Sequence, residues 1–122
     1  MPLVQVDMSR KMYEAHAKQM SVELQQAFIE ALDVNPLDKF QVFRPRDEGE
    51  LVFDPDYGLG NRQNLVLIQI LMVHRYSADQ KRGLYRAIVT RLVAIGIRKE
   101  DILIGVTENG FEDWCAGRLH GE

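Results

Sequence analysis

The stretch LVLIQILMV, from Leu65 to Val73, is the most apolar run of this sequence and is interrupted only by Gln69. A short run rich in Ile, Leu and Val is typical of a central β-strand covered on both faces. It is too short to cross a membrane as a helix, which takes roughly 20 residues. We therefore expect this strand at the centre of the fold and no membrane partner.

A helix and a further strand follow this run. Ser77 and Gln80 have the spacing of a capping box, in which two side chains satisfy free backbone donors at a helix start. Gly96 stands where the C-terminal cap of this helix is expected. The apolar pattern of residues 101–107 predicts the next strand. The apolar stripe of this helix consists of Leu84, Tyr85, Ile88, Val89, Leu92 and Ile95.

The same order of elements precedes the central run. Residues 2–7 alternate apolar and polar side chains as a short strand does, and helical spacing begins near Ser9. We expect Asn35-Pro36 to end this helix, and residues 39–43 to form a strand that Arg44-Pro45 stops. The apolar stripe of the first helix consists of Met20, Leu24, Ala27, Phe28, Ala31 and Leu32.

A long segment, residues 46–64, separates the two halves and carries glycines, a proline and many charges. It predicts a loop with a short hairpin at residues 51–53, and loops of this length are often functional. We expect the preceding Arg44-Pro45-Arg46 to lie in solvated loop.

The pattern predicts one α/β (α+β) domain over residues 1–122, built from two βαβ units at about 2–45 and 65–107. Right-handed crossovers would place both helices on one face of a four-stranded sheet. The other face would be bare in a monomer, and an exposed apolar face of that kind usually marks assembly. We therefore expect a homo-oligomer.

Composition excludes several classes of function. A net charge of -3 provides no basic field for nucleic acid. The single cysteine, Cys115, cannot form an internal disulfide and the N-terminus lacks the features of a secretory signal, so we expect a cytoplasmic protein. The histidines His16, His74 and His120 lack metal-ligand spacing, and no motif predicts a metal or cofactor.

A series of short motifs extends along nearly the whole chain: Met1-Pro2, Asp38-Lys-Phe-Gln41, Ile68-Gln69, Gln80-Lys81, Glu108-Asn109 and Asp113-Trp114. In this order and spacing they resemble the malonate semialdehyde decarboxylase branch of the tautomerase superfamily. The resemblance implies a homotrimer of βαβ repeats that acts on a small oxo acid without a cofactor. It also implies three active sites, each built around an N-terminal proline.

The resemblance makes Pro2 the catalytic residue once Met1 has been removed. An α-amino group has an ordinary pKa of roughly 7.7 to 8.0, against roughly 10.4 for lysine, so a desolvated proline amine can act as a general base near pH 7. It could then move a proton in keto-enol tautomerisation, or assist decarboxylation as a cation or an iminium. The alternative is that a proline at this position means only that Met1 is removed.

In the resembled decarboxylase an Arg-Pro-Arg motif binds the substrate carboxylate, and residues 73–76 stand in its place. Counted from Gln69, Arg75 matches the second arginine; counted from the second helix, His74 and Tyr76 match the two arginines. Arg75 would then be the carboxylate anchor, since a guanidinium can grip a carboxylate with two parallel hydrogen bonds. Alternatively Arg75 is a solvated turn residue, and His74 is either a second donor to the substrate or part of the turn.

Three further residues enter the predicted site through the resemblance. Asp38 matches an aspartate that helps decarboxylation or hydration, although an aspartate is also common in a turn before a strand. Phe111 and Trp114 resemble the aromatic residues of an apolar pocket wall, and they could equally pack against a neighbouring subunit.

These residues allow more than one function, because one fold supports many reactions. We expect first a tautomerase of a 2-oxo acid of phenylpyruvate type. The alternatives are a malonate semialdehyde decarboxylase or related hydratase, and a non-catalytic trimeric binding protein.

Overall fold

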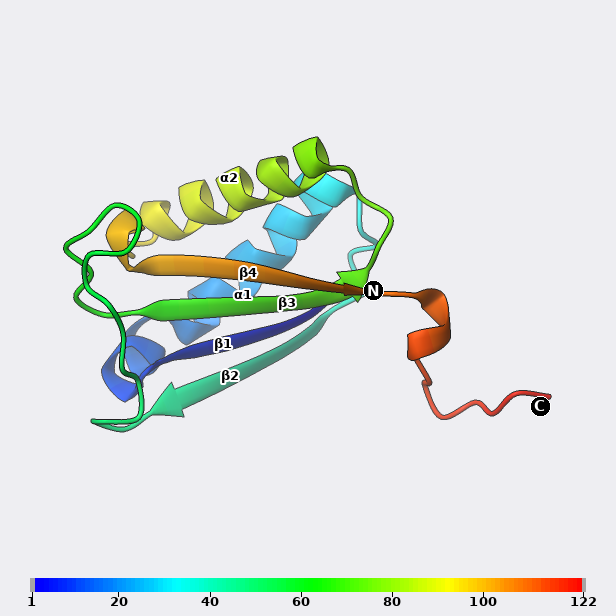
Figure 1. Cartoon of the computed structure of the whole chain (residues 1–122), viewed down its shortest axis with the longest axis horizontal. Coiled ribbons are helices and arrows are strands. Elements are labelled where there is room, and N and C mark those ends of the chain that lie inside the picture. The colour runs from blue at the N-terminus through cyan, green and yellow to red at the C-terminus, as the bar shows by residue number, and fades with distance from the viewer. Residues whose placement is uncertain (1, 122) are drawn as a thin grey trace.

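The computed structural model describes residues 2–121 as two successive strand-helix-strand units (Figure 1). The elements of the first unit are β1 (Leu3–Ser9), α1 (Arg10–Leu32) and β2 (Phe40–Arg46), and those of the second are β3 (Val66–Val73), α2 (Ala78–Ala94) and β4 (Ile102–Asn109). Two short 3-10 helices, η1 (Lys99–Asp101) and η2 (Phe111–Asp113), flank β4. None of the helices described is long and apolar enough to span a membrane.

The four strands form one sheet in the order β2-β1-β3-β4. β1 is parallel to β2 and β3 is parallel to β4, while the two units meet through the antiparallel pair β1 and β3. Both helices pack against one face, and the core between them and the sheet includes Val6, Ile68, Phe28 and Leu84. The predicted four-stranded sheet with two helices on one face is therefore confirmed.

The helix boundaries show which local sequence signals were sufficient to predict where a helix begins or ends. In α2 the predicted capping box is present, because the Ser77 hydroxyl accepts from the Gln80 amide at 3.1 Å and the Gln80 side chain accepts from the Ser77 amide at 2.9 Å. Gly96 follows α2 with a positive φ, as expected for its C-terminal cap. By contrast, α1 ends at Leu32, before the predicted stop at Asn35-Pro36, because Asp33 already adopts the left-handed conformation with φ 54.

The two helices are tied together on their outer surface by Arg91 of α2. Its guanidinium donates to Glu23 at 3.0 Å and to Glu30 at 3.3 Å, both on α1. The hydrogen bond to Glu23 is the main reason that the pKa of Arg91 lies above its ordinary value, with a further contribution from Glu30. The cation thus stays bound between two carboxylates.

The prediction that Arg44-Pro45 stops the second strand was wrong. β2 continues through Pro45 to Arg46, and it is an edge strand, where a missing backbone donor is tolerated. Arg44 and Arg46 do not form a solvated loop, because each donates a 2.9 Å hydrogen bond to the buried carboxylate of Asp7 on β1. These two ion pairs hold the end of the strand to its neighbour.

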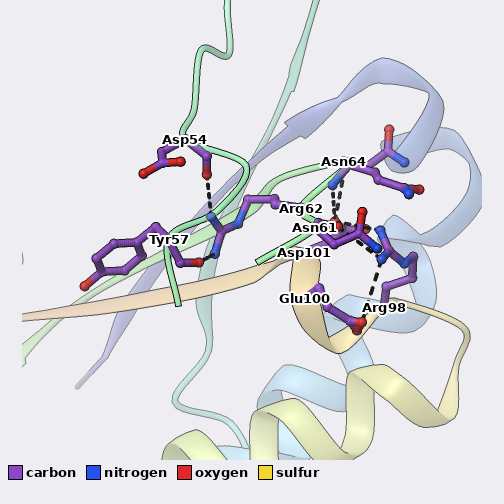
Figure 2. A network of polar contacts seen from close by, with 9 residues as sticks. Asp54, Tyr57, Asn61, Arg62, Asn64, Arg98, Glu100 and Asp101 are labelled. Carbon is purple, nitrogen blue, oxygen red and sulfur yellow. Dashed lines mark hydrogen bonds and ion pairs between the residues drawn. The ribbon is translucent and has the colours of Figure 1, made fainter. Parts of the chain in front are cut away.

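The hairpin predicted at residues 51–53 is absent, and this part of the loop is irregular. Side chains satisfy the loop backbone instead (Figure 2). Buried Arg62 donates to two loop carbonyls at 2.7 and 2.9 Å, and buried Asp101 accepts from two consecutive loop amides at 2.8 and 3.1 Å. The loop is thus held by two buried charged side chains on its inner side.

The sheet face opposite the helices is not covered within residues 2–121, so within one chain β3 is buried on one face and bare on the other, as expected for a monomer. Its central residue Gln69 is exposed, and Leu67 and Leu71 on either side are half-buried. Leu3 and Leu103 on neighbouring strands extend this apolar face. Around Gln69 the surface forms a hollow of about 230 Å³.

Candidate active site

The strand register gathers three distant segments at one end of the sheet. Leu3, the residue after Pro2, pairs with Phe40 on β2 and with Leu71 on β3. Pro2 therefore lies beside the start of β2, which follows Asp38, and beside the end of β3, which leads into residues 74–76. β4 ends at the same place, with Asn109 paired to the last residue of β3 (Figure 1).

Pro2 is buried at this end of the sheet, next to an apolar pocket. The pocket has a volume of about 250 Å³ and is lined by Leu3, Phe40, Trp114, Cys115 and Ala116. Such surroundings disfavour an ammonium relative to a neutral amine. Of the two aromatic residues predicted for the wall, Trp114 lines this pocket, whereas Phe111 is not among the lining residues and is 69% exposed.

The turn after β3 presents His74 and the charged side chain of Arg75 at the same end. The guanidinium of Arg75 lies over the ring of Tyr76, 5.7 Å from its centroid, and Tyr76 in turn packs against the core. The side chains of His74 and Arg75 are exposed, and Arg75 makes no ion pair with any residue in the range 2–121. Neither residue lines the pocket beside Pro2.

Asp38 lies in the turn before β2, where its backbone is held on both sides. Its amide donates to the carbonyl of Asn35 at 2.9 Å, and its carbonyl accepts from the buried side chain of Gln25 at 3.1 Å. Its position two residues before Phe40 places it near the end of the sheet where Pro2 lies.

Residues at the end of β4 connect Trp114 of the pocket wall to the sheet and to α2. Trp114 donates through its indole nitrogen to the side-chain carbonyl of Asn109 at 2.8 Å, and the Gly110 amide donates to the Asp113 carboxylate at 2.8 Å. Glu108, which precedes Asn109 on β4, forms a 3.0 Å ion pair with Lys81 of α2. The last three motifs of the sequence are therefore in contact with one another.

Leu3, Phe40 and Asn109 also belong to this end of the molecule, although the sequence did not predict them there. The first two begin adjacent strands, but nothing local shows that those strands are neighbours. Within residues 2–121, no group of three or more His, Cys, Asp or Glu side chains could hold a metal ion.

Comparison with known proteins agrees with this fold. The chain belongs to the tautomerase family, because the family model described as "Tautomerase enzyme" matches residues 38–117. It is 34% identical over 119 residues to the probable tautomerase YusQ of Bacillus subtilis (strain 168), covering 96% of this chain and 94% of that protein. The probable tautomerase YrdN of the same organism is 29% identical, with 96% and 92% covered.

Solved structures place the chain within one branch of the superfamily. FG41 malonate semialdehyde decarboxylase inhibited by 3-bromopropiolate superposes with a TM-score of 0.87 at 25% identity, covering 95% of this chain and 89% of that one. A second malonate semialdehyde decarboxylase gives a TM-score of 0.85 at 28% identity, covering 95% and 91%. The resemblance stated from the motifs is thus confirmed, and the protein is an enzyme of the tautomerase superfamily.

Proposed function

We propose that this enzyme is a cofactor-independent keto-enol tautomerase of a small 2-oxo acid of phenylpyruvate type, with the free amine of Pro2 as acid and base. The observation that carries the proposal is the burial of Pro2 beside an apolar pocket walled by Phe40 and Trp114. A pocket of this kind suits an aromatic side chain on the substrate. The similarity to two probable tautomerases supports the reaction class.

In the proposed mechanism, neutral Pro2 removes a proton from the carbon beside the substrate carbonyl. The electron pair of that C–H bond forms the C=C bond, and the π pair of the carbonyl moves to its oxygen to give an enolate. The protonated amine then returns a proton to the enolate oxygen. Removal of Met1 is required, because an amide nitrogen cannot act as a base.

The other predicted site residues bind the substrate and shield the amine. Arg75 binds the substrate carboxylate, because its exposed guanidinium makes no ion pair within residues 2–121 and lies on the turn at the same end of the sheet. His74 and Tyr76 contribute to the same anion site. Trp114, which lines the pocket beside Pro2, excludes water from the amine.

The direct test is intact-mass spectrometry after incubation with a 3-oxo acid and a hydride reductant, which traps an iminium on a free amine. We expect the mass of Met1 to be missing and one adduct to map to Pro2. Retained Met1 without an adduct would reject Pro2 as the reactive group.

Malonate semialdehyde decarboxylation is the second candidate, because the two solved decarboxylases share both the fold and 25 to 28% of the sequence. In this alternative Asp38 assists the loss of carbon dioxide or binds a water for hydration. We expect Asp38→Asn to reduce decarboxylation strongly and tautomerisation little. Equal losses in both assays would contradict this division of roles.

We also propose that the enzyme assembles as a homotrimer through its bare sheet face. The half-buried leucines Leu3, Leu67, Leu71 and Leu103 line that face, and burying them would remove apolar surface from water. Among the similar folds is a fused 4-OT described as a symmetric trimer, at 13% identity and a TM-score of 0.79.

A further inference from the structure

Asn109, the last residue of β4, contacts two parts of the candidate site at once. Its side-chain carbonyl accepts from the indole nitrogen of Trp114 at 2.8 Å. Its backbone carbonyl accepts from the amide of His74 at 2.8 Å, which extends the ladder between β3 and β4 into the turn that carries Arg75. One residue therefore links Trp114 of the pocket wall to the turn that carries Arg75.

We propose that Asn109 is a positioning residue, because it fixes where the Trp114 ring lies relative to Arg75. The site would then select substrates that carry both a carboxylate and an apolar group. This proposal rests on the proposed function. Asn109 touches neither Pro2 nor a reacting atom in this scheme, and it acts through Trp114.

The geometry around Trp114 gives the reason why a single hydrogen bond matters. The ring follows β4 by only a few residues, in a short turn that is held by the bond between Gly110 and Asp113. That bond shapes the backbone, but it does not determine where the indole ring points. The bond to Asn109 restricts the ring, and the ring lines the pocket together with Leu3 and Phe40.

Without the side-chain acceptor, the indole can rotate away from the pocket and the substrate loses one apolar wall. A net hydrogen bond of ordinary strength corresponds to about a 2- to 10-fold change in an equilibrium constant. We expect Asn109→Ala to raise KM for phenylpyruvate by about this factor with a smaller change in kcat, because the ring contacts the substrate and not the transferred proton. Asn109→Asp keeps an acceptor oxygen for the indole but adds a negative charge near the proposed anion site, so this variant is compared with the wild type by fluorescence and not by KM.

Trp114 is the single tryptophan of the chain, so fluorescence excited at wavelengths that the four tyrosines do not absorb reports on this ring alone. We expect Asn109→Ala to shift the emission maximum to longer wavelength and to increase quenching by acrylamide, whereas Asn109→Asp should resemble the wild type. Gln26→Ala, an exposed position on α1, is the control and should leave the emission unchanged. Circular dichroism would verify that each variant is folded. If folded Asn109→Ala has the emission and quenching of the wild type, the proposal is overturned.

A double-mutant cycle with Trp114→Phe tests whether Asn109 acts through the indole. Phenylalanine keeps an aromatic wall but has no N–H group, so Asn109→Ala should have less than about a 2-fold effect on KM in that background. An undiminished effect would overturn the proposal. If the wild-type enzyme does not turn over phenylpyruvate, the proposed function fails, and the fluorescence result still decides whether Asn109 positions the ring.

Discussion

At the level of single residues, the ring amine of Pro2 is the group on which the proposed reaction depends. Pro2→Ala retains a free N-terminal amine but replaces a secondary amine held in a ring by a mobile primary one. We expect kcat for phenylpyruvate to fall by at least about 10-fold, in the range found for loss of a general base. Steady-state kinetics of the variant, with loss of Met1 verified by mass, measures this. Unchanged turnover would contradict the role of Pro2.

The proposed role of Arg75 concerns binding and not proton transfer. We expect Arg75→Ala to raise KM by about 10-fold with little change in kcat, because it removes a charge-assisted hydrogen bond to the substrate carboxylate. Arg86→Ala is the matched control, since Arg86 is an exposed arginine on α2 outside the pocket beside Pro2. Identical kinetics in the two variants would show that Arg75 is a solvated turn residue.

At the level of helices, strands and loops, the long loop depends on Asp101, whose side chain is 2% exposed. Its carboxylate accepts from the amides of Gln63 and Asn64 and lies 3.4 Å from Arg98 (Figure 2). Asp101→Ala would remove the buried acceptor of both partly buried amides and of Arg98, so we expect a loss of about 2 to 4 kcal/mol in the free energy of unfolding.

Urea unfolding measures this loss through the midpoint, and an unchanged m-value would show that the change lies in stability alone. Asp56→Ala is the control, because Asp56 is an exposed aspartate of the same loop. Equal midpoints for the two variants would mean that the loop is held by other contacts.

For the molecule as a whole, the bare sheet face predicts the state of assembly. We expect sedimentation equilibrium to give about three times the mass of one chain. Leu71→Glu places a charge in the middle of that face and should produce monomers, since burial of an unpaired carboxylate is strongly unfavourable. Val93→Glu, at an exposed position on α2, should remain trimeric. A wild-type monomer would contradict the assembly through this face.

Local sequence patterns were sufficient to predict the order of the elements, the central strand and the limits of α2. These features follow from signals within a few residues of one another: apolar periodicity, the Ser77 and Gln80 capping box, and a glycine in the left-handed conformation after the helix. The family could also be recognised, since it depends on which residues occur and in what order.

Contacts between distant residues became visible only in the folded chain. Arg44-Pro45 was predicted to end a strand, but Pro45 lies within β2. An edge strand tolerates the missing backbone donor of proline, and the adjacent arginines bind Asp7 on β1. Likewise, strand register pairs Leu3 with Phe40, and Trp114 lines one pocket together with both of them. Such contacts join segments far apart in sequence, and their energies depend on the packed arrangement of the whole chain, so no local pattern encodes them.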